Sequence, residues 1–132
     1  MTTADDVNRA EGALRDVLRE LTDPHEGECL FCYVYRMLDF GCLPDRFTWA
    51  RRWRDLRAPR ATGLERRLEA RGGFCDCEIF VNGWRPRDLV ADEQGEQGEP
   101  VYSAVMPRCR RVRRGSTQPC PLWVPRPRLF AF

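Results

Sequence analysis

The chain contains no lysine, because all 22 of its basic residues are arginine. It therefore has neither a Schiff-base lysine nor the lysine of a phosphate-binding loop, which excludes two classes of enzyme. It also has a single histidine, His25, and its only serines are Ser103 and Ser116. A Ser-His-Asp or Cys-His hydrolytic centre would depend on that one histidine, so we expect a protein that is not an enzyme.

Long apolar runs and an export signal are also missing. The longest candidate run, Leu30 to Tyr35, is far shorter than the roughly 18 residues that span a bilayer. The first residues are polar and acidic, with neither the basic nor the apolar stretch of a secretory signal. We therefore expect a cytoplasmic protein without a membrane partner, in which the thiols stay reduced.

Charge is distributed unevenly over the 132 residues, although the formal net charge is only +2. Residues 1–45 carry ten acids and four arginines, whereas residues 46–71 carry nine arginines and three acids. Residues 101–132 carry seven arginines, no acid and several prolines. The composition predicts a cysteine-rich domain over residues 1–90, followed by an acidic linker and a basic, mostly flexible tail over residues 91–132.

Periodicity predicts a mainly helical domain. Helices are indicated near residues 6–21, 28–40, 47–57 and 62–72. From Cys75 to Val81 every second residue is apolar or a cysteine, which indicates a short strand or hairpin near residues 74–82. The expected fold class is α+β, mainly α, with about four helices, one short strand or hairpin, metal stabilisation and an irregular tail.

Five of the seven cysteines cluster in the first two thirds of the chain, at Cys29, Cys32, Cys42, Cys75 and Cys77. Tetrahedral zinc holds its thiolate sulfurs about 3.8 Å apart, so its ligands usually come in local pairs. Cys29 and Cys32 lie one helical turn apart, and Cys75 and Cys77 share one side of the expected strand. We predict a structural zinc site made by these two pairs, with Cys42 as the alternate ligand that displaces one of them.

Other interpretations of the cysteines remain open. They can be small buried hydrophobic residues, or they can hold an iron–sulfur cluster in place of zinc. Cys109 and Cys120 are eleven positions apart and have no partner pair, so we do not expect them to be ligands. His25 is interpreted as an exposed turn residue. A closed four-thiolate site activates no water, so Asp76 and Glu78 could act as acid or base only at an incomplete site.

Three segments carry a resemblance to a known family. They are Glu28–Cys42, Arg51–Thr62 and Gly72–Phe80, the last with the string Gly72-Gly-Phe-Cys-Asp-Cys-Glu78. Over about residues 26–84 the chain resembles a family of small, uncharacterised actinobacterial proteins with a domain of unknown function. The resemblance implies a shared fold and cysteine cluster but no activity. Many members of that family carry Cys-Asp-His where this chain has Cys42-Leu-Pro, a departure that removes a possible histidine ligand and bears on the role of Cys42.

Three functional classes fit these patterns. We favour a zinc-stabilised interaction module with a protein partner, because a domain this small gains much of its folding free energy from a metal. The second class is nucleic-acid binding through the arginine-rich segments 46–71 and 108–114. The third is a redox-sensing or iron–sulfur regulatory protein, although the Cys-x2-Cys-x5-Cys spacing of such regulators is absent.

Overall fold

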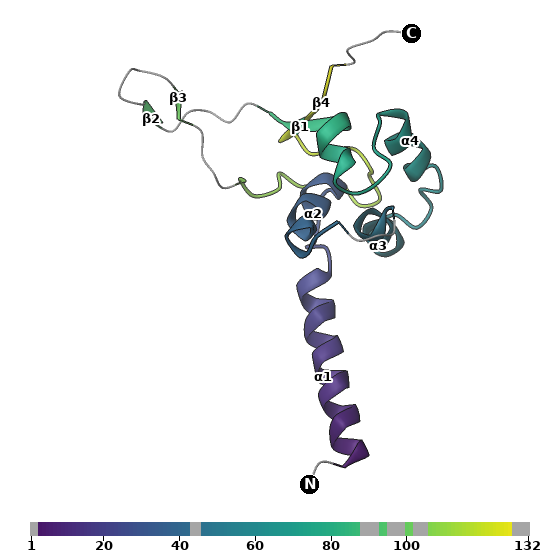
Figure 1. Ribbon diagram of the computed structural model, residues 1–132. Coiled ribbons are helices and arrows are strands. Elements are labelled where there is room, and N and C mark those ends of the chain that lie inside the picture. The colour runs from purple at the N-terminus through teal and green to yellow at the C-terminus, as the bar shows by residue number, and fades with distance from the viewer. Residues whose placement is uncertain (1–2, 43–45, 88–92, 95–99, 102–105, 128–132) are drawn as a thin grey trace.

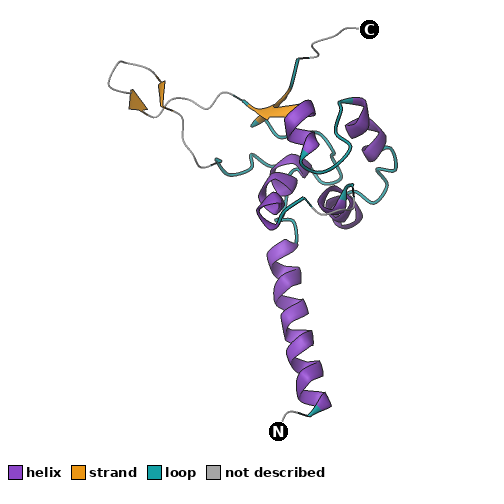
Figure 2. Ribbon diagram, in the orientation of Figure 1, coloured by secondary structure: helices purple, strands orange, loops and turns teal. Residues whose placement is uncertain are grey.

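The computed structural model of the chain describes residues 3–42, 46–87, 93–94, 100–101 and 106–127 (Figure 1). Its elements are α1 (Ala4–Thr22), α2 (Leu30–Met37), the 3₁₀ turn η1 (Leu38–Phe40), α3 (Thr48–Arg57), α4 (Leu64–Ala70), the π-helical turn η2 (Ile79–Gly83), β1 (Trp84–Pro86), β2 (Glu93–Gln94), β3 (Pro100–Val101) and β4 (Trp123–Pro125). β1 pairs with β4 and β2 with β3, both antiparallel. The fold is therefore α+β and mainly α, as the sequence predicts (Figure 2).

The core lies where α2 packs against α3. The buried side chains of these two helices are Leu30, Phe31, Tyr33, Val34, Met37, Trp49, Ala50 and Trp53. α4 adds Leu64 and Leu68. The ring of Trp84 in β1 lies 4.6 Å, centroid to centroid, from that of Phe31, so the small sheet packs directly against α2.

The strand expected near residues 74–82 lies slightly further along the chain. Residues 74–77 form a bend and a turn, residues 79–83 form η2, and β1 begins at Trp84. The cause is Asp76, whose fully buried carboxylate accepts hydrogen bonds from the backbone N–H groups of Trp49 (2.9 Å) and Ala50 (3.1 Å). Because Asp76 points into the core, the chain turns at this residue. A turn of this kind can place every second side chain on one side, which is also the sequence pattern of a strand.

The segment 106–127 packs on the helical body, although the composition predicts a mostly flexible tail. Its buried residues are Cys120, Leu122 and Trp123. The backbone N–H of Val112 donates to Gly27 O (2.9 Å), and that of Arg126 donates to Gly83 O (2.8 Å). The composition of this segment is dominated by proline and arginine, so it does not reveal that these few apolar side chains are buried. Residues 91–92, 95–99, 102–105 and 128–132 of the expected linker and tail lie outside the described residues.

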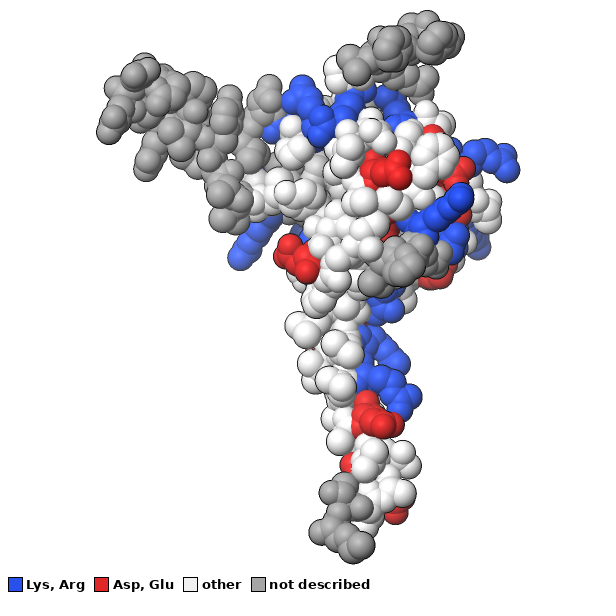
Figure 3. Space-filling view, viewed as in Figure 1, with Lys and Arg blue, Asp and Glu red and all other residues white. Residues whose placement is uncertain are grey.

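α1 extends away from this body as a separate rod (Figure 1). It begins with a capping box in which Asp6 N donates to Thr3 Oγ1 (3.2 Å) and Thr3 N donates to Asp6 Oδ2 (3.4 Å). None of its residues is buried, and its exposed large apolar side chains are Val7, Leu14, Val17, Leu18 and Leu21. Figure 3 shows an uncharged side beside a charged one along this helix. None of the described helices combines the length and apolarity of a membrane span.

Candidate metal centres

The seven cysteines are free thiols and lie in two groups. The four-thiol group comprises Cys29, Cys32, Cys109 and Cys120, and the three-thiol group comprises Cys42, Cys75 and Cys77. Within each group the sulfur atoms all lie within 4.8 Å of one another. Spacing predicts that the pairs 29/32 and 75/77 share one zinc site. The structure keeps each pair together but puts the two pairs in different groups.

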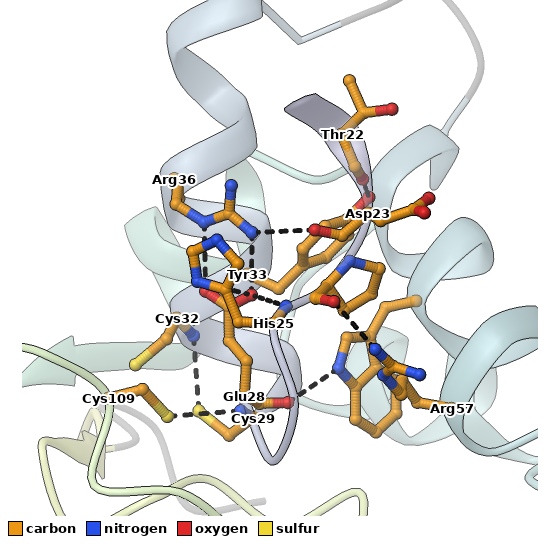
Figure 4. A network of polar contacts seen from close by, with 12 residues as sticks. Thr22, Asp23, His25, Glu28, Cys29, Cys32, Tyr33, Arg36, Arg57 and Cys109 are labelled. Atoms are coloured by element: carbon orange, nitrogen blue, oxygen red, sulfur yellow. Dashed lines mark hydrogen bonds and ion pairs between the residues drawn. The ribbon is translucent and has the colours of Figure 1, made fainter. Parts of the chain in front are cut away.

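The first half of the four-thiol group is built by the start of α2. Cys29 is the N-cap residue of this helix, and its Sγ accepts a hydrogen bond from Cys32 N (3.3 Å). The backbone N–H of Cys29 donates in turn to Cys109 Sγ (3.3 Å) (Figure 4). Such donors favour the thiolate over the thiol, because their dipoles point at the negative charge. They give both sulfur atoms the environment of a metal ligand.

The second half comes from the segment 106–127. Arg111 N donates to Cys109 Sγ (3.3 Å), and the indole Nε1 of Trp123 donates to Cys32 Sγ (3.2 Å). The sulfur atoms of Cys32 and Cys120 lie 3.7 Å apart, close to the roughly 3.8 Å edge of a tetrahedral zinc–thiolate centre. Cys29 and Cys120 are buried, so this group is shielded as a structural site would be.

A second layer of polar contacts holds Cys29 in place (Figure 4). Glu28 is buried and accepts from Arg36 Nε (3.1 Å) and Nη2 (2.8 Å), while its backbone oxygen accepts from Trp53 Nε1 (3.0 Å). This pairing fixes the residue before the first ligand. His25 is exposed and faces Glu28 at 4.0 Å, and it is not part of either thiol group.

The four thiols influence one another's protonation strongly. A hydrogen bond from Cys32 lowers the pKa of Cys29 to about 6, against the opposing effect of burial. The pKa of Cys32 is raised by the same hydrogen bond and by burial. Burial is the main cause that raises the pKa of Cys109 to about 11. Four thiolates this close therefore need a cation, and binding one releases the remaining protons.

The three-thiol group lies at the surface. Cys42 is exposed, Cys75 and Cys77 are partly buried, and the sulfur atoms of the latter two are 3.3 Å apart. Hydrogen bonds with Cys75, and secondarily with Cys42, raise the pKa of Cys77 to about 12. With three thiols this group lacks the fourth thiolate of a closed zinc site.

Spacing does not place Cys109 and Cys120 in a thiol group, because neither has a neighbouring cysteine. A signal was nevertheless present, since Leu122 and Trp123 directly follow Cys120. Large apolar residues beside an otherwise isolated cysteine indicate a buried thiol.

Comparison with known proteins bears mainly on the three-thiol group. Residues 30–82 match a family model described as "Protein of unknown function (DUF2695)". No curated protein and no solved structure shows significant similarity to the chain. The matched segment contains the whole three-thiol group but only Cys32 of the four-thiol group. It supports the resemblance to an uncharacterised family and assigns no activity.

Proposed function

We propose that the chain is an interaction module folded around a structural zinc ion bound by Cys29, Cys32, Cys109 and Cys120. The observation that carries this proposal is the convergence of the four sulfur atoms within 4.8 Å, with N–H donors directed at three of them. Four thiolates fill the coordination sphere of zinc and leave no position for a reacting water, so such an ion stabilises structure rather than catalysing a reaction.

The role of the ion is to join two distant parts of the chain. Cys29 and Cys32 begin α2, whereas Cys109 and Cys120 lie in the C-terminal segment that carries buried Trp123. A metal bound between them adds its binding free energy to folding, because the unfolded chain has no preformed site.

Zinc fits this group better than an iron–sulfur cluster does. A cluster places several irons and inorganic sulfides between its thiolates, and it would hold the sulfurs further apart than a single ion does. The 3.7 Å between the sulfurs of Cys32 and Cys120 matches single-ion tetrahedral geometry. This favours a single ion such as zinc over an iron–sulfur cluster.

The charged surface favours a nucleic acid as the partner of the module. A hollow of about 1310 Å³ is lined by six described arginines, which are Arg57, Arg60, Arg67, Arg111, Arg113 and Arg114. All six are exposed. Two arginine-rich segments far apart in sequence thus meet at one place, where Val112 docks on Gly27. Guanidinium groups pair well with phosphates and are suited to a polyanion.

The expected contacts are with the phosphate backbone rather than with bases. Trp49 and Trp53, the aromatic residues interleaved in the basic segment, are buried and cannot stack on bases. Glu26 and Glu28 also line the hollow. Arg36 neutralises the charge of Glu28, and the six arginines outnumber the exposed Glu26. Binding should therefore show little sequence preference and a steep salt dependence.

Metal content tests the zinc centre. Tag-free protein is measured by elemental mass spectrometry, together with its absorbance spectrum, and compared with the double variant Cys109→Ser/Cys120→Ser. We expect a colourless protein that loses one equivalent of zinc in the variant. Unchanged zinc content in the variant would refute the four-thiol centre. Iron together with sulfide in the wild-type protein would show that the thiols hold an iron–sulfur cluster and not zinc.

Fluorescence anisotropy with a labelled single-stranded oligonucleotide, at several salt concentrations, tests the partner. Arg60→Ala/Arg113→Ala should reduce the slope of log affinity against log salt by about 1 to 2. The matched control Arg15→Ala/Arg19→Ala removes the same charge from α1, away from the hollow. An equal loss in both variants would indicate general attraction, and no binding at low salt would leave a protein as the partner.

A further inference from the structure

The three-thiol group is assembled from two chain segments that the fold brings together. Cys42 follows η1 and the Gly41 cap, whereas Cys75 and Cys77 lie in the turn that leads into η2. Their sulfur atoms lie within 4.8 Å of one another. Three soft donors at one point of the surface are suited to a thiophilic cation.

The turn that carries Cys75 and Cys77 is held rigidly. Asp76 between them points inward and binds the first backbone N–H groups of α3, which leaves the two flanking thiols on the outer side. Gly72 precedes the turn with φ +85°, and a Cβ on Gly73 would lie 3.2 Å from Ile79 Cα. The close approach of this backbone to η2 therefore favours glycine at position 73, because a larger residue would push η2 outward.

Trp49 ties both halves of the group to α3. Its backbone N–H donates to Asp76 Oδ2 (2.9 Å), and its indole Nε1 donates to Gly41 O (3.1 Å), directly before Cys42. One buried residue thus fixes the segment of Cys42 and the segment of the other two thiols. Such preorganisation is what a binding site requires and what scattered surface cysteines lack.

A fourth donor stands beside the three thiols. Glu78 Oε1 lies 3.6 Å from Cys75 Sγ. Its other oxygen, Oε2, accepts from Asn82 Nδ2 (3.4 Å), which also donates to Gly72 O (3.0 Å). Asn82 therefore orients the carboxylate and leaves Oε1 beside Cys75 Sγ. Glu78 is not one of the residues whose ligand atoms all lie within 4.8 Å of one another, so its side chain must rotate to reach an ion held by the three thiols. Three thiolates and one carboxylate are a ligand set that zinc accepts.

We propose that Cys42, Cys75 and Cys77, with the carboxylate of Glu78, form a second metal site that binds a thiophilic divalent cation of the Zn²⁺ class and exchanges it with solvent. Exchange follows from exposure: Cys42 is exposed and the other donors are only partly buried, whereas the four-thiol group includes two buried cysteines. One carboxylate in place of a thiolate also weakens the hold on a soft ion. The chain would then combine one permanent zinc with one that can leave.

Metal counting in the full-length protein tests this second site. Zinc-loaded protein is mixed with a colorimetric zinc chelator, and Cd²⁺ uptake is then followed by its thiolate absorbance. The wild-type chain should hold two equivalents, one released at least 10-fold faster than the other. Cys42→Ser/Cys77→Ser should abolish the fast equivalent alone, with an unchanged circular dichroism spectrum. A single equivalent in the wild type, or two in this variant, would overturn the proposal.

The same experiment tests the four-thiol centre and the second site independently of each other. Cys109→Ser/Cys120→Ser should remove the slow equivalent and keep the fast one. Loss of all metal in that variant, with a circular dichroism spectrum like that of the wild type, would overturn the second site. Glu78→Gln keeps every thiol and serves as the mildest variant. It should retain two equivalents but release the fast one about 10-fold more readily. An unchanged rate would exclude the carboxylate as a ligand.

Discussion

The sulfur atoms of Cys32 and Cys120 lie 3.7 Å apart, although the two residues are 88 positions apart in the sequence. Cys32 belongs to the helical segment that matches the family model, and Cys120 lies well beyond its end. A metal at this point would therefore join the matched helical segment to a region that composition alone would leave unfolded.

The first prediction concerns the stability that this junction provides. Cys120→Ser should remove one zinc and lower the melting temperature by more than about 10 °C, because structural zinc contributes several kcal/mol to folding. Cys42→Ser is the matched control, since it removes an exposed thiol from the other group. Its melting temperature should stay within about 3 °C of the wild type. Equal melting temperatures for the two variants would contradict the structural role of the four-thiol group.

Asp76→Asn should destabilise the protein by about 2–3 kcal/mol, because a buried amide cannot accept both hydrogen bonds that the carboxylate receives from Trp49 and Ala50. Urea denaturation followed by circular dichroism measures the change. Asp16→Asn on exposed α1 makes the same chemical change and should shift the midpoint very little. A similar shift in both variants would mean that capping of α3 by Asp76 contributes nothing specific.

Trp49→Phe should affect the two metal equivalents unequally. The ring still fills the core, but the hydrogen bond from Nε1 to Gly41 O is lost, which frees the segment before Cys42. We expect the fast equivalent to be released several-fold faster and the slow one to keep its rate. Trp53→Phe loses the bond to Glu28 O, beside Cys29, and should disturb the slow equivalent instead. The same response in both variants would argue for general loosening.

Tyr33 gives a prediction for alkaline pH. It is fully buried, its hydroxyl donates to Thr22 O (2.6 Å), and burial raises its pKa to about 12. The unfolded chain, with a pKa of about 10, loses this proton first. The contribution of Tyr33 to the free energy of unfolding should therefore be constant below pH 10 and fall between pH 10 and 12, by at most about 3 kcal/mol. Tyr33→Phe should lack this dependence in urea denaturation measured over that range.

Periodicity was sufficient to predict the helices, and much of the candidate site could be read from spacing. Apolar residues at helical intervals locate α1 to α4 to within a few residues, since one face of each amphipathic pattern repeats locally. The close pairs 29/32 and 75/77 were recognised for the same reason. Each depends on residues two or three positions apart, where chain geometry alone decides proximity.

The sequence does not predict which other cysteines each pair meets, because that depends on contacts between residues far apart in the chain. The inward turn of Asp76 follows from its meeting the start of α3, which no local pattern encodes. The placement of Cys109 follows from the backbone N–H of Cys29, its partner across 80 positions. Spacing alone combined the two pairs into one site, whereas tertiary contacts distribute them between two.

The order of synthesis gives the four-thiol group a further consequence. The ribosome makes Cys29 and Cys32 long before Cys120, and the 88 positions between Cys32 and Cys120 correspond to roughly 4–18 s of elongation. During that interval the first two thiols exist without their partners, whereas the three-thiol group has all its members once Cys77 is made, 43 positions before Cys120. Nascent chains would therefore acquire metal first at the exposed group, and the buried centre would close only after the C-terminal segment emerges.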